Sequence, residues 1–163
     1  MEKNADDTKK IKCKWIKEMM EFDQVCFPTD FWEERDWRSL LEDEQAIYYA
    51  LLDSEKIVGQ IFVYNWSGEK DYVKIMSLAI HPDKRKQGLA HQLLDHVTKE
   101  MGQGEVKYFC GETRESNKAM QKVFEDCGYE LDGIEKGYYI HPGENAISNY
   151  SYDYKEKRDK KLI

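Results

Sequence analysis

The chain has 163 residues, of which 40% are hydrophobic and 35% are charged, and its formal net charge is −7 at pH 7. This composition is typical of a soluble globular protein, and the length suits a single domain over residues 1–163 with a substantial core. The negative charge argues against nucleic-acid binding and favours a cationic partner such as an amine. No apolar run approaches the roughly 18–20 residues that span a bilayer, and residues 1–7 lack the apolar region of a signal peptide. The sequence therefore predicts a cytoplasmic protein with no membrane partner and no nucleic-acid partner.

The first half of the chain shows two helical patterns followed by strand-like runs. Apolar residues recur at helical spacing from Ile16 onward, and a second helix is predicted over 31–41 with Asp30 as its N-cap. Two runs rich in β-branched and aromatic residues, 46–52 and 57–64, are joined by a short polar turn and predict a hairpin. The other expectations here are a flexible segment over about 1–8, a short strand over about 9–14, a strand over 72–80, and core positions for Trp32, Trp37, Leu40 and Leu41.

The second half alternates helices and strands. A helix over 88–101 leads to a β-rich run at 106–110, and a strand–helix–strand unit of this length predicts a crossover with a parallel strand pair. A further helix has Ser116 as its candidate N-cap and Gly128 at its C′ position. The remaining expected segments are two antiparallel strands, about 129–139 and 147–154, and a flexible, solvated basic tail over about 156–163.

This order of elements predicts an α/β domain built on one mixed sheet. The cysteines and histidines do not show the spacing of metal ligands, so the sequence predicts free thiols and no metal site. The residues concerned are Cys13, Cys26, Cys110, Cys127, His81, His91, His96 and His141.

The most informative stretch is the turn between the strand that ends at Ile80 and the helix that begins near Leu89. The first N–H groups of a helix have no intrahelical partner and carry the positive end of the helix dipole. Gly88 allows a ligand to approach the backbone closely, and Arg85 and Lys86 add positive charge suited to phosphate oxygens. The pattern favours a phosphate site; the alternative is a solvated basic turn that binds nothing.

The spacing Arg85-x-x-Gly88-x-Ala90, preceded by Ile80-x-Pro82, resembles the acetyl-CoA pyrophosphate signature of the GNAT superfamily of N-acetyltransferases. The resemblance covers nearly the whole chain. It implies the GNAT fold, with one mixed, mostly antiparallel sheet, a central parallel strand pair and helices on both faces. It also implies acetyl-CoA as cosubstrate. The residues that it assigns to acetyl-CoA are Leu78, Ala79, Ile80, Arg85, Lys86, Gln87, Gly88, Leu89, Ala90, Asn117 and Phe124.

A second specific piece, Asn117 followed by Phe124 and Gly128, is similar to the closing segment of the same family. The resemblance implies that Asn117 touches the pantetheine or phosphate arm; the alternative is a helix-start residue bonded to its own backbone. The family places a tyrosine where this chain has Phe124 and often uses it to protonate the leaving thiolate. Phenylalanine has no proton to give, so that role is vacant or has moved, for example to Tyr138.

A closer likeness is to the bacterial ribosomal-protein N-terminal alanine acetyltransferases. The run at 112–117, Glu-x-Arg-x-Ser-Asn, resembles their Glu-Val-Arg-Ala-Ser-Asn, and the tyrosine pair that begins at Tyr138 resembles theirs. In those enzymes the glutamate serves as base and the tyrosines shape the acceptor site, which implies Glu112 and Tyr138 as catalytic residues. The alternative for Glu112 is an ion pair with Arg114 or with a lysine.

The sequence therefore predicts direct transfer of an acetyl group from acetyl-CoA to a primary amine, either a protein N-terminus or a small amine, in a ternary complex. A covalent route through Cys110 is open in principle, but a cysteine of this kind is commonly a buried small hydrophobe. The phenylalanine at position 124 motivates an alternative, a non-catalytic acyl-CoA-binding or sensor domain. The identity of the acceptor and a homodimer both stay open.

Overall fold

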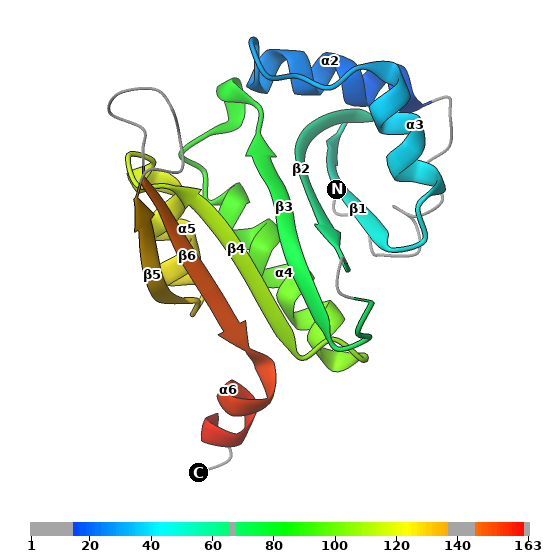
Figure 1. Ribbon diagram of the computed structural model, residues 1–163. Helices are drawn as coiled ribbons and strands as arrows, with labels where there is room; N and C mark the ends of the chain where they lie inside the picture. Colours follow the sequence, from blue (N-terminus) through cyan, green and yellow to red (C-terminus); the bar gives the residue numbers. More distant parts are fainter. Residues whose placement is uncertain (1–14, 66–67, 137–145, 162–163) are drawn as a thin grey trace. The chain divides into compact units, whose positions relative to one another are not determined.

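The fold is that of a computed structural model, which describes residues 15–65, 68–136 and 146–161 of the chain. Its elements (Figure 1) are α2 (Ile16–Cys26), α3 (Glu34–Glu42), β1 (Ala46–Asp53), β2 (Lys56–Tyr64), β3 (Tyr72–Ile80), the 3-10 turn η2 (Pro82–Lys84), α4 (Leu89–Gln103), β4 (Tyr108–Arg114), α5 (Lys118–Asp126), β5 (Glu130–Lys136), β6 (Ala146–Asp153) and α6 (Tyr154–Lys161). The strand expected over about 9–14 and the tyrosine at position 138 lie outside the described residues.

Within the described ranges, six strands form one mixed sheet in the order β1-β2-β3-β4-β6-β5. β3 and β4 are parallel, whereas the pairs β1–β2, β4–β6 and β5–β6 are antiparallel. The parallel pair is connected through α4, because parallel strands need a crossover that is longer than a tight turn. The predicted mixed, mostly antiparallel sheet with one central parallel pair is confirmed.

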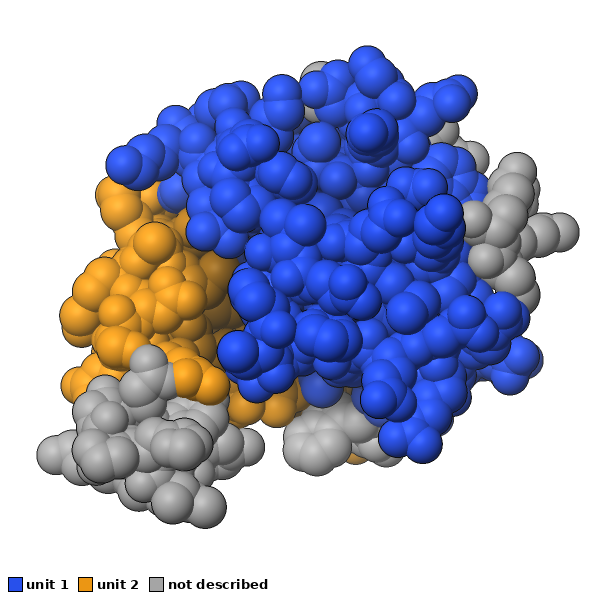
Figure 2. Space-filling view, turned by 90° about the horizontal axis from the view of Figure 1, so that it is seen from above, with its two compact units in different colours: residues 1–64, 76–93 blue, residues 65–75, 94–163 orange. Residues whose placement is uncertain are grey.

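The chain divides into two compact units, coloured separately in Figure 2. Unit 1 comprises residues 1–64 and 76–93, and unit 2 comprises residues 65–75 and 94–163. β3 and α4 each contribute residues to both units. The expectation of a single domain over 1–163 stays a prediction.

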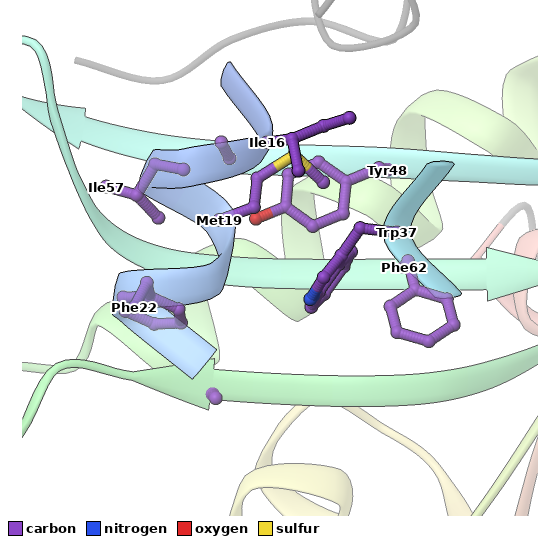
Figure 3. Packing of buried hydrophobic residues seen from close by; sticks show 9 residues of the cluster. Ile16, Met19, Phe22, Trp37, Tyr48, Ile57 and Phe62 are labelled. Atoms are coloured by element: carbon purple, nitrogen blue, oxygen red, sulfur yellow. The ribbon is translucent and has the colours of Figure 1, made fainter. Parts of the chain in front are cut away.

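Unit 1 is built on the β1–β2 hairpin, which was predicted. The turn residues Ser54 and Glu55 have φ values of +50° and +66°, and two left-handed residues suit the twist of a tight hairpin. α2 packs against β2 and α3 against β1, and these contacts bury Trp37 to 1% exposure. Figure 3 shows Trp37 beside Tyr48 and Phe62, with ring centroids 5.9 and 6.4 Å from its own. The predicted core position of Trp37 is confirmed, and Trp32, Leu40 and Leu41 pack against the same cluster.

α3 begins later than predicted, and Asp30 is not its N-cap. The N-cap is Glu33, whose backbone N–H donates to the carboxylate of Asp36 at 3.0 Å. The N–H of Trp32 donates instead to the carboxylate of Asp23 in α2, at 2.6 Å. The prediction was wrong because these two carboxylates bind the backbone just before α3, and Asp23 is too distant in the sequence for local capping rules to reveal.

In unit 2, β4 lies between the first half of β3 and β6. An added Cβ at Gly111 of β4 would lie 2.6 Å from Cζ of Phe124 in α5. The ring of Phe124 also stacks on Tyr150 of β6, with centroids 4.9 Å apart and an interplanar angle of 11°. Gly111 is therefore the position at which the strand makes room for the Phe124 ring.

The two ends of α5 test two capping predictions. The N-cap is Asn117 and not Ser116, because the Asn117 side-chain oxygen accepts the N–H of Met120 at 3.1 Å. Both residue types are good caps and they are adjacent, so the choice between them was not visible in the pattern. At the other end Gly128 has a φ of +89°, which confirms its predicted C′ position.

The basic tail contains a helix, α6, that was not predicted. Asp153 accepts a backbone N–H of its first turn at 3.0 Å, and the Tyr154 ring lies against Gly102. The ammonium of Lys107 lies 5.2 Å from the centroid of the same ring. The two contacts of the Tyr154 ring come from α4 and the segment after it, so the charged sequence of the tail alone does not show them. The predicted flexibility over 156–163 stays a prediction.

Candidate functional site

The turn between β3 and α4 presents backbone donors at the start of a helix. Lys86 and Gly88 have φ values of +65° and +76°, so the chain reverses through two left-handed residues. Gln92 donates to the Gly88 carbonyl at 3.0 Å and makes the first bond of the helix. The N–H groups of 88–91 therefore precede the intrahelical ladder and carry the positive end of the dipole. Since 85–88 are exposed, this turn suits an anion such as a pyrophosphate.

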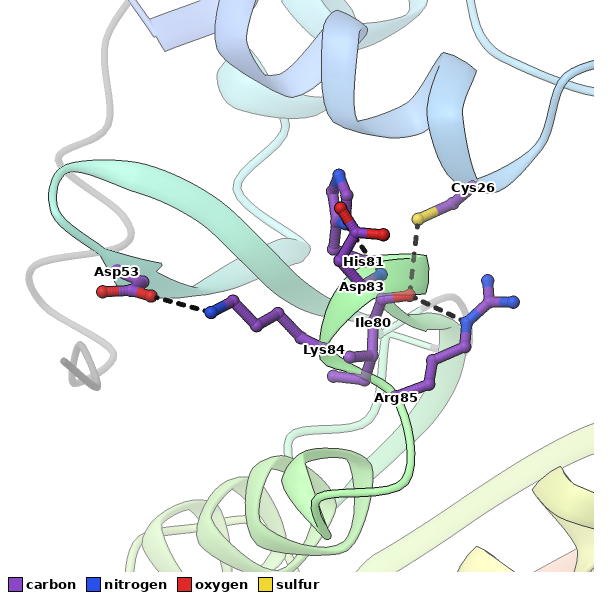
Figure 4. Close-up of polar contacts among 7 residues, drawn as sticks. All are labelled: Cys26, Asp53, Ile80, His81, Asp83, Lys84 and Arg85. Atoms are coloured by element: carbon purple, nitrogen blue, oxygen red, sulfur yellow. Dashed lines mark hydrogen bonds and ion pairs between the residues drawn. The ribbon is translucent and has the colours of Figure 1, made fainter.

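The basic side chains of the turn offer less to an anion than its backbone N–H groups do (Figure 4). Lys84 Nζ lies 3.3 Å from the carboxylate of Asp53, and Arg85 Nε donates to the Ile80 carbonyl at 3.2 Å. Because its Nε is bonded to the end of β3, Arg85 has only its terminal nitrogens to offer a phosphate. The side chain of Lys86 is exposed. The predicted contacts at 86–90 therefore fit best as backbone contacts.

The end of β3 is tied to α2 through the same carbonyl. Cys26 Sγ lies 3.7 Å from the Ile80 oxygen that also accepts from Arg85. Burial raises the pKa of the Cys26 thiol, an effect that Arg85 opposes, so the sulfur keeps its proton at neutral pH. Ala79 and Ile80 are buried and Leu78 is half-buried. A ligand at these three residues would therefore meet mainly their backbone.

Glu112 projects from β4 in unit 2 and has a cationic neighbour. Its carboxylate lies 3.5 Å from the ammonium of Lys74 in β3, with both side chains one-fifth to one-third exposed. This ion pair is the alternative that the sequence left open for Glu112. The ion pair keeps the Glu112 carboxylate beside the Lys74 ammonium. The predicted role of Glu112 as a base stays a prediction.

Asn117 and Phe124 occupy structural positions in unit 2. The oxygen of Asn117 caps α5, and its NH₂ group could donate to acetyl-CoA. Phe124 is 2% exposed and is enclosed by Gly111 and Tyr150. The predicted cofactor contacts of both residues stay predictions.

Cys110 does not have the environment of a nucleophile. Its sulfur lies 2.8 Å from the hydroxyl of Tyr72. Burial raises the pKa of the thiol, and the Tyr72 bond and Lys74 only partly oppose that effect. Since the thiolate is the reactive form, this environment disfavours a covalent route.

The candidate residues thus fall into two groups. The residues from Leu78 to Ala90 belong to unit 1, and Glu112, Asn117 and Phe124 belong to unit 2. Sequence reasoning missed Lys74, although a lysine between the apolar strand residues Val73 and Ile75 was a usable signal. It also missed Asp23, a carboxylate that is 5% exposed and whose pKa is raised by burial.

In the described ranges, no cluster of three or more His, Cys, Asp or Glu side chains could hold a metal ion. Among the helices of those ranges, none has both the length and the apolar character needed to cross a bilayer.

Known acetyltransferases resemble this chain. The model of the acetyltransferase (GNAT) family matches residues 14–129. A Bacillus subtilis (strain 168) protein provisionally named ribosomal protein bS18-alanine N-acetyltransferase is 24% identical over 132 residues, which cover 81% of this chain and 85% of that protein. The ribosomal protein bS18-alanine N-acetyltransferase of Escherichia coli (strain K12) is 32% identical over 69 residues, or 42% of this chain and 47% of that enzyme.

Solved structures of acetyltransferases share the fold. The crystal structure of the ribosomal-protein-S18-alanine N-acetyltransferase from Escherichia coli superposes with a TM-score of 0.77, covering 88% of this chain and 90% of that one. At 21% sequence identity this match concerns the fold.

Proposed function

The chain belongs to the acetyltransferase (GNAT) family, and we propose that it transfers the acetyl group of acetyl-CoA to a primary amine, with the amino terminus of a protein as the first acceptor to test. The observation that carries this proposal is the turn before α4. There, left-handed Lys86 and Gly88 place the first N–H groups of a helix, which precede its intrahelical bonds, at an exposed position. That arrangement fits a pyrophosphate without a metal or a dedicated side chain.

The residues of unit 1 would hold the cosubstrate. Residues 86–90 bind the pyrophosphate through backbone N–H groups, and the terminal nitrogens of Arg85 add charge. The backbone at Leu78–Ile80 pairs with the amides of the pantetheine arm. An N–H at Leu78 or Ala79 polarises the thioester carbonyl and stabilises the oxyanion that forms when the amine attacks.

Glu112 would receive the proton that the attacking amine loses, directly or through a water. An α-amino group with a pKa near 7.7–8.0 is already roughly one-tenth neutral at pH 7, whereas a lysine near 10.4 is neutral at a few parts in ten thousand. An α-amino acceptor therefore makes a small demand on the base. The Glu112 carboxylate lies 3.5 Å from the ammonium of Lys74.

The leaving group is the thiolate of CoA. Once the amine nitrogen has bonded to the carbonyl carbon, the C–S bond breaks and the sulfur takes a proton. Phe124 cannot supply that proton, so Tyr138 or solvent would. A positioned acid contributes about 10²–10⁴-fold, and a thiol with a pKa of about 8.5 is a tolerable leaving group without one.

The test is CoA release from acetyl-CoA with two peptide pools, one with free amino termini and one with blocked termini and many lysines. We expect release only with free termini. Release only with the lysine pool would overturn the choice of acceptor but keep acetyl transfer. Measurable acetyl-CoA binding with no release from either pool or from small amines would favour the second candidate.

That second candidate is a domain that binds acyl-CoA without catalysis. One observation favours it, namely the buried Phe124 ring at a position where the resembling family has a tyrosine. CoA release that depends on both the protein and an amine acceptor excludes it.

A further inference from the structure

A cavity of about 550 Å³ lies in unit 2, apart from the residues assigned to acetyl transfer. Ligand sites typically occupy about 300–1,000 Å³, so this volume can accept a side chain or a small molecule. It opens among β3, β4, β5, β6 and the start of α6. Its lining residues are Tyr72, Tyr108, Phe109, Cys110, Glu130, Asp132, Ser151, Tyr152, Asp153, Glu156 and Lys157.

The lining is acidic and aromatic together. It contains four carboxylates and a single cationic side chain, that of Lys157, which lies 3.3 Å from Glu130. Asp132 accepts the hydroxyl of Ser151 at 2.9 Å, and this partner is neutral. The wall also includes Tyr108, a ring left 39% exposed. Carboxylates beside aromatic rings suit a cation on an aliphatic stem, because the rings cover the stem and attract the charge.

The sheet register places this cavity on the same face as Glu112. Cys110 pairs with Ser151 of β6 on one side and with Lys74 of β3 on the other. Residues two apart in a strand point to the same face, so Tyr108, Cys110 and Glu112 share one face of β4. The Lys74–Glu112 ion pair across those strands agrees with this assignment.

We propose, building on the proposed acetyl transfer, that this cavity binds a lysine or arginine side chain of the acceptor polypeptide downstream of its reacting amino terminus. An extended chain advances about 3.3 Å per residue, the same rise as β4. An acceptor whose first residue lies at Glu112 therefore reaches the cavity, two to four strand positions away, at about its third to fifth residue. Basic residues there distinguish one protein amino terminus from another.

The test uses peptides with one free amino-terminal sequence that differ only in residue 3, 4 or 5, which is lysine, glutamine or glutamate. We expect kcat/KM from CoA release to be about fivefold higher with lysine than with glutamine at one of these positions. The preference should shrink as salt is raised, because part of the site is exposed. Equal rates with all three residues at every position would overturn the inference while leaving acetyl transfer intact.

Variants of the protein then test whether the preference for lysine arises at the cavity. Asp132→Asn keeps an acceptor for Ser151 but removes the charge, so the lysine preference should disappear. Asp132→Lys should reverse it in favour of glutamate, an outcome that a misfolded variant would not produce. Asp95→Asn is the matched control, because Asp95 on α4 is paired with Lys99 and does not line the cavity. An Asp95 variant that loses the preference as fully as Asp132→Asn would show a long-range charge effect and contradict the site.

A binding measurement separates the two proposals. Amino-terminally acetylated versions of the lysine and glutamine peptides cannot be substrates, and their affinities are measured by isothermal titration calorimetry. If no peptide is acetylated but the lysine peptide binds in an Asp132-dependent way, the cavity is supported and the proposed function fails. If the lysine peptide neither reacts nor binds better than the glutamine peptide, the cavity proposal is wrong.

Discussion

The turn after β3 and the face of β4 that carries Tyr108, Cys110 and Glu112 present charge by opposite means. The turn presents mainly backbone N–H groups, since Lys84 and the Nε of Arg85 are bonded to other groups of unit 1. The face of β4 presents side chains that the register brings together from several strands, such as Glu112 with Lys74 and Asp132 with Ser151. A site made of backbone N–H groups depends on neighbouring residues and can be recognised in a short motif. A site made of side chains from several strands depends on pairing between distant segments.

The largest effect on activity should come from a change of the Glu112 side chain. Glu112→Gln keeps the size of the side chain but cannot accept a proton, so we expect kcat to fall about 100-fold for a lysine acceptor. The loss should be smaller for an α-amino acceptor, more of which is neutral at pH 7. The measurement is the rate of CoA release from pH 6 to pH 9 with each acceptor.

Lys74→Met serves as the control for Glu112. It removes the ion pair and retains the carboxylate, so a base at position 112 should keep most of its activity in this variant. Equal losses in both variants, with unchanged pH–rate profiles, would mean that the pair is structural and that the proton goes elsewhere.

The next largest effect should come from a change in the turn after β3, and it should appear in the affinity for acetyl-CoA. Gly88 has a φ of +76°, where a β-branched residue is strained although its Cβ would meet open space. Gly88→Val should move the turn and weaken acetyl-CoA binding about tenfold or more. Gly68 offers a matched comparison, with a φ of +79° and open space as well. Gly68→Val should carry similar strain and leave the affinity, measured by calorimetry, nearly unchanged.

A third test asks whether the missing tyrosine can be restored. Cζ of Phe124 lies where Gly111 leaves room for it, so a hydroxyl at that carbon would press on β4. Phe124→Tyr should lower the free energy of unfolding by about 1–3 kcal/mol and should not raise kcat. Urea denaturation with parallel kinetics measures both quantities. A stable variant with faster CoA release would show that the hydroxyl finds space and donates its proton.

The difference between the local turn and the side chains assembled from several strands also explains what the sequence could predict. The helix start at Leu89, the glycine at 88 and the Gly128 cap were predictable because each depends on neighbouring residues. The N-cap of α3 was missed because Asp23 competes for the backbone from another helix. The cavity was missed because Asp132 and Tyr108 meet only through the β4–β6–β5 register.

The smallest expected effect is on the pH dependence of the free energy of unfolding, and it concerns one thiol in each unit. Burial raises the pKa of Cys26, an effect that Arg85 opposes. Burial and then the carboxylates of Asp95 and Asp126 raise the pKa of Cys127 from its ordinary 9.0 to about 11. Between those values the unfolded thiol loses its proton while the folded thiol keeps it, so the free energy of unfolding must fall as pH rises.

Because Cys127 is partly exposed, its share of that fall should be only about 1 kcal/mol between pH 9 and pH 11. Cys127→Ala should therefore lose less stability over this range than the unaltered chain, as measured by urea denaturation at each pH. Cys26→Ala should change the slope less, since Arg85 offsets part of the burial effect there. If the two variants share one slope, the acidic surroundings of Cys127 contribute nothing beyond burial, and the electrostatic contrast between the two regions does not extend to their thiols.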